Sequence, residues 1–499
     1  MESLSNFCKY CVGTGPDTTE KGKYTELGKS FSSYLNPFTS HNAGILLSYQ
    51  LVGISLYFLS TPISVYMIDT LNVSSTQYSA FSTLVSLPWS LKFLFGMLSD
   101  GVPIMGYRRK SWLIIGWIIN SLTGFALGYM DDPSFASIAI FMFIGTSAYL
   151  LSDVCTDTMA VERSKCEPPV RRGSFQTSCY TIRSFGCIIG ALMGTLLYNT
   201  ASWGWGLSMS QLFLLSALLP VLFFLPSFWP LEEQASKHAL PDFSEQISSI
   251  WQLLQEKVVW TPITFIFTYN LMQIPNSAWT NFLVVGLDFT DFELGVITIA
   301  QAVLFWVGMI VYKKWFFTTS WRWIYIYTGA IGALFSLGQI VLVKQWNTQI
   351  GIPDLWFALG DSAISTLVAA IQYMPMCILF SMICPEGNEG LTYALLTTLS
   401  NLAGSIASDI GSALTLIWNV DNTTLESGDY SGILYLTILT SCLQLAPLLL
   451  VWILPDSKAE QLKMIAEGGK SERAGTVLAT VIIVSLIVVF ASSIYMTFF

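Results

Sequence analysis

The sequence predicts an all-α polytopic membrane protein, and three observations lead to this fold class. Of its 499 residues, 53% are hydrophobic and only 11% are charged, whereas soluble domains carry about 25% charged residues. Apolar segments long enough to cross a bilayer, about 20 residues each, follow one another along most of the chain. The basic residues collect in alternate connections between these segments, as expected when cytosolic loops hold the Lys and Arg residues.

Twelve apolar segments form the predicted core, and a thirteenth follows near the C-terminal end. The thirteenth segment contains no charged residue and is long enough to span. The predicted spans are 43–68, 75–99, 111–130, 135–161, 173–198, 208–229, 260–285, 292–312, 322–343, 354–383, 391–417, 431–454 and 474–499.

The distribution of charge predicts that the N-terminus is cytosolic. The chain has 23 Lys and Arg residues. With this orientation, Lys92 and Arg183 fall inside spans and Lys344 falls in an external loop. All the others lie in the predicted cytosolic segments. A wrong number of spans in the first twelve would mix the basic residues between the two sides. The thirteenth span would then place the C-terminus outside.

The spans fall into two halves of six, at 43–229 and 260–455. They are preceded by a cytosolic segment (1–42) and followed by a cytosolic connector (456–473) and the extra helix (474–499). The linker, 230–259, contains apolar residues at helical spacing, which predicts an amphipathic helix on the cytosolic surface. Two six-helix halves joined by a cytosolic linker are typical of the major facilitator fold.

A conformational latch is predicted where span 2 reaches the cytosol. Gly96, Asp100, Gly106, Arg108 and Arg109 combine an acid, a turn glycine and a basic cluster. Asp100 can lie at the N-terminus of a facing helix, where the macrodipole favours negative charge. The basic residues can pair with acids such as Asp157 on neighbouring helix ends. The alternative is that these basic residues only mark the cytosolic side.

Ionisable residues within the spans are the next candidates, because each is costly unless it is paired or hydrated. Counting from the span ends places Lys92, Asp153 and Arg183 at similar depths. In one interpretation, Lys92 and Arg183 bind a substrate carboxylate, since Arg can do so with two parallel hydrogen bonds, and Asp153 or Asp157 exchanges protons. In the other interpretation, the three residues form a structural ion network that joins spans 2, 4 and 5.

Further substrate-binding candidates lie in spans 1, 7 and 10, which line the central cavity of this fold. They are Tyr57, Asn270, Gln273, Asp361 and Gln372. Asp361 has no basic residue nearby on its own helix and is therefore also a candidate for proton coupling. The alternative for each of these residues is an interhelical hydrogen bond, worth about 1 kcal/mol.

Three motifs resemble the folate–biopterin transporter family, a branch of the major facilitator fold. The resemblance covers about residues 43–455. It implies a secondary transporter of folates, pterins or related metabolites. The sequence departs from the family pattern in two respects. The second half carries only a weakened copy of the basic loop motif, at Lys313 and Lys314, and the thirteenth span is additional. The motifs comprise Pro88 to Asp100 with Pro103 to Arg109, then Ser152 to Arg163, and finally a block containing Pro385, Gly387, Glu389, Tyr393 and Asn401.

Several classes of function are excluded or disfavoured. No dinucleotide motif, Walker-type loop or metal-ligand cluster occurs in the sequence. We therefore expect no enzyme activity, no cofactor and no metal site, and we expect an ion gradient or exchange to supply the energy. Cys8 and Cys11 lack the second ligand pair that structural zinc requires. The expected partners are a small-molecule substrate, co-transported protons and the lipid bilayer. Nucleic acid is not expected, and the protein should function as a monomer.

Other points remain open in the sequence. The cargo could be another small metabolite, such as a nucleoside, an amino-acid derivative or a sugar, or the chain could be a non-transporting receptor or scaffold. The membrane could be the plasma membrane or an internal one. Asn72 and Asn422 begin glycosylation sequons in predicted external loops, of which we favour Asn422. Small residues at Gly186, Gly190 and Gly194 predict close packing of span 5, for which span 8 is the expected partner.

Overall fold

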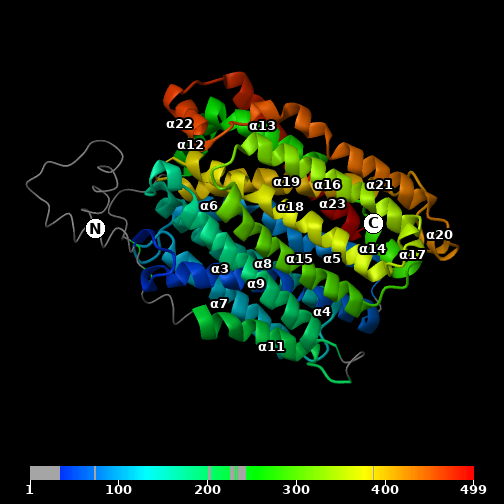
Figure 1. The fold of residues 1–499 in the computed structure, drawn as a ribbon. Coiled ribbons are helices and arrows are strands. Elements are labelled where there is room, and N and C mark those ends of the chain that lie inside the picture. Colours follow the sequence, from blue (N-terminus) through cyan, green and yellow to red (C-terminus); the bar gives the residue numbers. More distant parts are fainter. Residues whose placement is uncertain are drawn as a thin grey trace, which may run out of the picture.

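The computed structural model describes residues 34–498, except 72, 74, 200–203, 225–230, 232, 234–242 and 386. Cys8, Cys11 and Asn72 lie outside the described residues. The described residues form a bundle of long helices, in which the helices of the first part of the chain lie beside those of the second (Figure 1). The structure is all-helical over these residues, apart from two isolated β-bridges.

We refer to helices α3 to α11 as the N-terminal half and to helices α13 to α21 as the C-terminal half. The N-terminal half contains α3 (Ala43–Tyr57), α4 (Ser60–Val65), α5 (Ser75–Ser90), α6 (Lys92–Gly101), α7 (Lys110–Gly128), α8 (Phe135–Lys165), α9 (Ser174–Leu197) and α11 (Met209–Leu219). The C-terminal half contains α13 (Lys257–Met272), α14 (Trp279–Asn281), α15 (Asp291–Val311), α16 (Trp321–Val343), α17 (Trp346–Gln349), α18 (Asp354–Ile383), α19 (Glu389–Leu414), α20 (Asn422–Glu426) and α21 (Ser431–Leu443). The linker helix is α12 (Phe243–Gln255), and α22 (Lys458–Glu467) and α23 (Glu472–Phe498) follow the second half.

Nine helices among the described residues are long and apolar enough to cross a membrane, or ten if the bent pair α5–α6 counts as one span. Three predicted spans fall outside this set. The helix in span 6 is shorter, the helix in span 7 stops at Met272, and α19 has the length but many Ser, Thr and Gly residues. The count of thirteen spans therefore stays a prediction.

Two predicted spans are interrupted rather than continuous. Span 2 bends by 41° between α5 and α6, directly after Pro88 and just before Lys92. Span 7 leaves the helical conformation after Met272, ahead of Pro275. Interruptions at membrane depth persist only where the freed backbone groups find protein partners. They therefore indicate where the bundle provides internal polar contacts.

The glycine face of α9 packs against α3, so the expectation that it contacts span 8 was wrong. A Cβ atom on Gly186, Gly190 or Gly194 would lie 2.2–2.6 Å from backbone oxygens of α3 or of Phe58, the residue that follows it. The GxxxG spacing predicts a face that permits close approach, but it does not specify the partner. The closest helix–helix contact of the N-terminal half therefore lies between spans 1 and 5.

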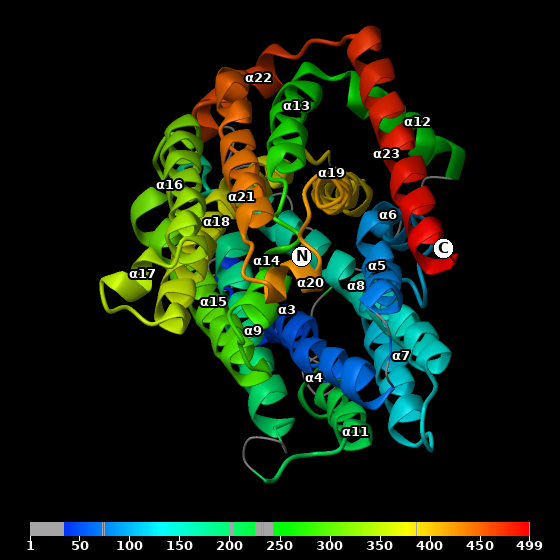
Figure 2. The same ribbon diagram turned by 90° about the vertical axis from the view of Figure 1, so that its right-hand side faces the viewer.

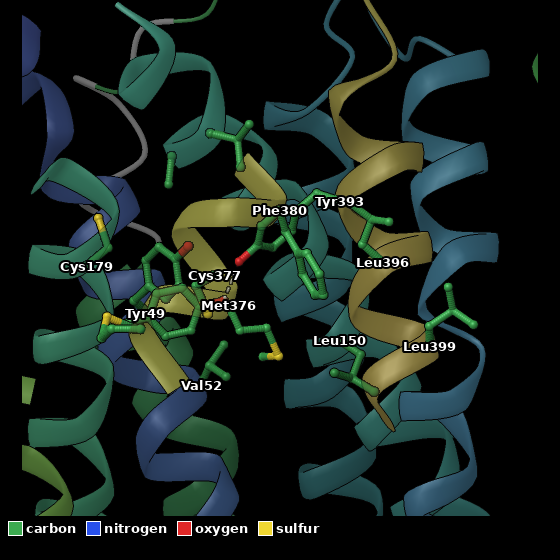
Figure 3. Packing of buried hydrophobic residues seen from close by; sticks show 14 of the residues in the cluster. Tyr49, Val52, Leu150, Cys179, Met376, Cys377, Phe380, Tyr393, Leu396 and Leu399 are labelled. Atoms are coloured by element: carbon green, nitrogen blue, oxygen red, sulfur yellow. Dashed lines mark hydrogen bonds between the residues drawn. The ribbon is translucent and has the colours of Figure 1, made fainter. Parts of the chain in front are cut away.

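One hydrophobic core continues across the two halves. Figure 3 shows part of this core, in which aromatic, aliphatic and sulfur-containing side chains from both halves interlock. The side chains drawn include Tyr49, Leu150 and Cys179 of the N-terminal half and Met376, Cys377, Phe380 and Tyr393 of the C-terminal half. The halves are thus in tight contact in this conformation.

The extra helix α23 lies across one junction between the halves. It packs on α5 of the N-terminal half and on α19 of the C-terminal half, beside the linker helix α12 (Figure 2). Main-chain hydrogen bonds from Lys257 to Gly469 and from Ser471 to Gln255 join its start to the linker. On α12 itself, Phe243 and Ile247 are exposed while Leu254 is buried, as expected of an amphipathic helix.

Candidate functional site

Four ionisable side chains meet inside the N-terminal half. The Lys92 Nζ atom lies 2.7 Å from Asp153 Oδ2 and 3.2 Å from Asp157 Oδ2, and Arg183 Nη1 lies 3.0 Å from Asp153 Oδ1. Two cations thus face two carboxylates, which balances the charge as a buried cluster requires. The structure therefore brings together Lys92, Asp153 and Arg183, which the depth argument placed at one level.

The predicted pairing of Asp157 with Arg108 or Arg109 was wrong. In the structure, Asp157 accepts hydrogen bonds from Tyr49 (2.6 Å) and Tyr180 (3.1 Å), in addition to its contact with Lys92. Asp157 is one helical turn from Asp153, and both side chains point into the same cluster. Asp157 is thus part of the intramembrane network rather than of the latch.

A chain of hydroxyl groups extends this network to the other half. Tyr180 Oη lies 3.1 Å from Tyr393 Oη, which also accepts a hydrogen bond from Gln176 Nε2 at 2.8 Å. Tyr393 belongs to α19, whereas Tyr180 and Gln176 belong to α9. The family-motif residue Tyr393 therefore connects the ion network of the N-terminal half to the C-terminal half.

Arg183 is the most accessible member of the ion network. Its side chain is 11% exposed, compared with 4% for Lys92 and 0% for Asp153. The guanidinium group lies 5.7 Å from the ring centres of both Trp89 and Tyr180, within the range of cation–π attraction. Arg183 thus has a fixed position and keeps a small exposed fraction.

The break between α5 and α6 is completed by side chains of the opposite half. In an unbroken helix the Phe93 amide would donate to the Trp89 carbonyl. Here Phe93 N donates to Thr398 Oγ1 at 3.2 Å, and Asn401 Nδ2 donates to Trp89 O at 3.0 Å. Two α19 side chains thus replace one missing backbone hydrogen bond. This arrangement holds Lys92, the first residue of α6, beside the carboxylates.

The predicted latch residues meet α19 at the end of α6. Asp100 Oδ1 lies 2.6 Å from Arg109 Nη2, and Asp100 Oδ2 accepts a 2.7 Å hydrogen bond from the Leu391 amide at the start of α19. Asp100 is fully buried. A Cβ atom on Gly96 would lie 2.7 Å from the Gly390 carbonyl, so glycine permits this crossing. The latch therefore joins the two halves at the predicted cytosolic end.

The turn after α6 supplies the basic residues of the latch. Ile104 and Tyr107 exchange main-chain hydrogen bonds across a turn in which Met105 and Gly106 both have positive φ. This is the geometry that favours glycine at the position of Gly106. The turn directs Arg108 Nη2 to the Gly387 carbonyl of the opposite half, at 2.6 Å.

The block between α18 and α19 provides the other contacts of this end. Lys165 Nζ of α8 lies 2.8 Å from Glu389 Oε1 and 3.1 Å from the Pro385 carbonyl. Gly387 has φ +92°, a conformation that side chains rarely adopt. The motif residues Pro385, Gly387 and Glu389 thus receive contacts from Lys165 and Arg108 of the other half.

The linker adds a carboxylate that the sequence did not indicate. Glu233 accepts hydrogen bonds from the backbone amides of Arg108, Arg109 and Lys110 at 2.7–2.9 Å. These amides lie at the start of α7, where a helix favours an anion. Glu233 belongs to the linker, far along the chain from these amides, so no local sequence pattern could predict the contact.

A second carboxylate caps the start of α9. Glu167 accepts hydrogen bonds from the backbone amides of Ser174 and Phe175 at 3.0 and 2.8 Å. Burial nevertheless raises the pKa of the Glu167 carboxyl to about 7, against the opposing effect of these amides. This residue lies in the connection between α8 and α9, outside the spans.

A cavity of about 330 Å³ with several polar side chains in its lining lies within the C-terminal half, where span 7 is interrupted. Two of the substrate-binding candidates, Gln273 and Gln372, line it together with Tyr269 and Gln339. Gln372 Nε2 donates to Tyr269 Oη at 2.6 Å, whereas Gln273 Nε2 is buried without a hydrogen-bond partner. A free amide donor therefore borders the cavity.

Asp361 lies next to this cavity in a different environment from Asp153. Its Oδ2 atom accepts a 2.9 Å hydrogen bond from Gln339 Nε2, and its Oδ1 atom is buried without a hydrogen-bond partner. Among the described residues, no basic side chain forms an ion pair with it. Asp361 is thus a buried carboxyl group without a countercharge.

The remaining candidates lie apart from these clusters. Tyr57 packs beside a small apolar cluster of α9 and α15, and Asn270 is half-buried near the end of α13 without lining the cavity. Asn422 is exposed at the start of α20, where its Oδ1 accepts a 2.6 Å hydrogen bond from Asn281. Glycosylation there stays a prediction.

Comparisons with known proteins agree with this architecture. The BT1 family matches residues 52–475. The chain is 30% identical to a folate-biopterin transporter of Synechocystis sp. over 442 residues, which cover 86% of this chain and 87% of the relative. It is 25% identical to folate transporter 1 of Plasmodium falciparum, over 78% of this chain and 74% of the relative.

Solved structures show the same fold. The proton:xylose symporter XylE, of the major facilitator superfamily, aligns with a TM-score of 0.59 at 14% identity, over 87% of this chain and 99% of that one. An outward-facing bacterial homologue of the iron transporter ferroportin aligns with a TM-score of 0.55 at 14% identity, over 85% and 98%. The fold is therefore the major facilitator fold, in an integral multi-pass membrane protein.

Proposed function

The chain belongs to the BT1 family, and from this premise we propose that it is a secondary transporter that moves folates or pterins across a membrane by alternating access. The names of its relatives supply the substrate class. Membership of a transporter family also means that the chain is a transport protein rather than an enzyme.

The observation that carries the proposal is the latch between the halves. Asp100 contacts Leu391, Arg108 contacts Gly387, and Lys165 contacts Glu389. All three contacts lie at the predicted cytosolic end and are polar, so they can separate and re-form as the halves rock. A receptor or scaffold would gain little from such contacts. We infer that this conformation is closed to the cytosol and that the N-terminus is cytosolic.

Substrate recognition is divided between two places in this proposal. Arg183 binds a substrate carboxylate through the exposed part of its side chain, while Lys92 and Asp153 hold it in position. The cavity beside Gln273 and Gln372 receives the pterin ring. Its volume of about 330 Å³ is at the small end of ligand pockets, roughly 300–1,000 Å³, so it suits a bicyclic ring better than a whole folate.

Proton coupling is assigned to Asp361 in preference to Asp153. Asp153 contacts two cations, Lys92 and Arg183, which stabilise its charged form. Asp361 has one amide donor and an unpartnered oxygen. A buried carboxylate without a countercharge gains most from binding a proton.

Uptake by proteoliposomes tests the proposal. Purified protein should accumulate labelled folate or pterin, faster with an inward proton gradient than without one, and liposomes with an Asp100→Asn, Arg183→Leu double variant should not. Absence of uptake across a panel of folates and pterins would exclude this substrate class. Uptake of a nucleoside, an amino-acid derivative or a sugar instead would support the alternative that the protein carries another small metabolite.

A further inference from the structure

A second, smaller cavity of about 180 Å³ lies at the junction of α9 and the end of α15, on the side of the bundle away from α23. Ser178 and Ile182 of α9 form one wall, and Ile310, Lys313 and Lys314 form the other, with Phe38 at the edge. One wall thus belongs to each half. The proposed transport mechanism does not use this cavity.

The chemistry of the cavity is that of an anion site. Lys313 Nζ donates a 2.6 Å hydrogen bond to Ser178 Oγ, and Lys314 Nζ lies 5.0 Å from the ring centre of Trp315. Within the described part of the chain, neither lysine forms an ion pair with a carboxylate. Two adjacent positive charges therefore line the cavity without a carboxylate in direct contact.

The surroundings of the cavity are those of a lipid-facing surface. Phe38 is 67% exposed, Trp315 61% and Ile310 37%. Large exposed apolar side chains next to lysines are expected where a protein meets the headgroup layer of a bilayer. A soluble anion would gain nothing from these apolar side chains, whereas acyl chains would cover them.

We propose that this cavity binds the phosphate headgroup of an anionic phospholipid, with the acyl chains lying along Ile182 and Ile310. Basic pockets between membrane helices on the cytosolic side bind such headgroups in general. The placement in the inner leaflet rests on the cytosolic N-terminus of the proposed function, but the site does not depend on the transported substrate.

The bound lipid would also favour one conformation. Ser178 moves with the N-terminal half and Lys313 with the C-terminal half, so the two walls separate when the predicted cytosolic end opens. A headgroup held by both walls therefore stabilises the closed arrangement seen here, and its affinity is lower for the open one.

Lipid retention by the full-length protein tests this site without a transport measurement. Protein from nanodiscs of phosphatidylcholine with phosphatidylserine is analysed by native mass spectrometry, for the natural chain and for a Lys313→Gln, Lys314→Gln variant. We expect phosphatidylserine to bind roughly thirtyfold more weakly to the variant, since each basic residue near a charged lipid contributes a factor of about five. Equal binding by the two proteins would overturn the proposal.

Matched variants and soluble anions complete the test. Lys313→Arg, Lys314→Arg keeps the charge and should keep the lipid, whereas Lys463→Gln, at a 74% exposed cytosolic position, should change nothing. Inorganic phosphate and soluble glycerophosphoserine are added in thermal-shift assays. A shift as large as that given by phosphatidylserine would show a site for soluble anions and contradict the lipid assignment. Loss of folate uptake with retained lipid binding would overturn the proposed function alone.

Discussion

Asn401 of α19 donates a hydrogen bond to the carbonyl of Trp89, at the break between α5 and α6 in the other half. Thr398 accepts from the Phe93 amide at the same break. We expect Asn401→Ala or Thr398→Val alone to destabilise the protein by about 1–2 kcal/mol, because each leaves one backbone group unpaired. In the double variant, the Phe93 amide and the Trp89 carbonyl can pair with each other. The double variant should therefore cost less than the sum of the single ones.

Thermal unfolding of the four proteins in one detergent measures this coupling. Asn281→Ala, at an exposed position of the same half as Asn401, is the control for loss of an asparagine. Strictly additive effects would mean that the two side chains do not replace a helical hydrogen bond. The double variant should also lose transport, since straightening span 2 moves Lys92 away from Asp153.

Asp100→Asn should open the predicted cytosolic end. The substitution keeps the shape but removes the charge that accepts the Leu391 amide of the other half, and a hydrogen bond to a charged group contributes about 1.5–3 kcal/mol. The thiol of Cys384, which is 5% exposed at this end, reports the opening. In a chain that keeps only this cysteine, maleimide should label it roughly tenfold faster or more. Asp421→Asn, an exposed cap of α20, should leave the rate as it was.

Arg183→Leu should affect substrates according to their charge. Loss of a charge-assisted contact raises the KM for folate roughly tenfold to a hundredfold, whereas a pterin without a carboxylate should be affected much less. Arg183→Lys keeps the partner of Asp153 but lacks the planar fork, so it should restore stability more than folate affinity. Uptake kinetics for the two substrates provide the measurement. An equal loss for both would leave Arg183 with a structural role only.

Asp361→Asn should separate transport from the proton gradient. The Asn side chain cannot bind and release a proton as a carboxyl group does. Stimulation of uptake by an inward proton gradient should therefore disappear, while exchange of labelled for unlabelled substrate continues. Asp354→Asn, at the first residue of the same helix, where the side chain accepts a hydrogen bond from Asn347, is the matched control. Gradient stimulation that survives in Asp361→Asn would transfer the coupling role to another group.

Glu167 predicts a dependence of stability on pH. Burial raises its pKa to about 7 in the folded chain, while an exposed glutamate titrates near 4.3. The folded protein therefore binds the additional proton between these values. The contribution of this proton to the free energy of unfolding is complete below about pH 4.3 and is lost as the pH rises through 7. The loss amounts to at most about 3.7 kcal/mol.

Glu167→Gln keeps the acceptor oxygen and removes the titration. Its Tm should match that of the natural chain at pH 5 and exceed it at pH 8. The exposed Glu467→Gln variant should follow the natural chain at both values. A Glu167→Gln protein that is less stable at pH 8 would show that the carboxylate is stabilised by the α9 amides rather than penalised by burial.

Features that depend on position along one helix could be predicted from the sequence. Counting residues from span ends placed Lys92, Asp153 and Arg183 at one depth, and the structure brings them into contact. The helix of span 7 ends at Met272, three residues before Pro275, whose backbone cannot continue a helix. In these cases the rise per residue and the backbone of proline decide the outcome.

Features that depend on the choice of partner could not be predicted in this way. The glycines of α9 indicated a close contact but not that α3 would make it. Asp157 could have paired with several cations, and only the rotation of α8 selects Lys92. Thr398 and Asn401 lie about 300 positions from the break that they complete. No local pattern carries that information.

Because α23 is attached on one side only, the two lipid-facing sides of the junction between the halves differ. Its start is fixed to Gln255 and Lys257, next to α13, while its length rests on α5 of the opposite half. If the halves move relative to each other, we expect α23 to move with the C-terminal half, to which its start is hydrogen-bonded. Helix α5 would then slide along α23. An amphiphile that approaches the junction between the halves from the bilayer would therefore meet α23 on one flank, whereas on the other flank α9 and α15 pack directly on each other.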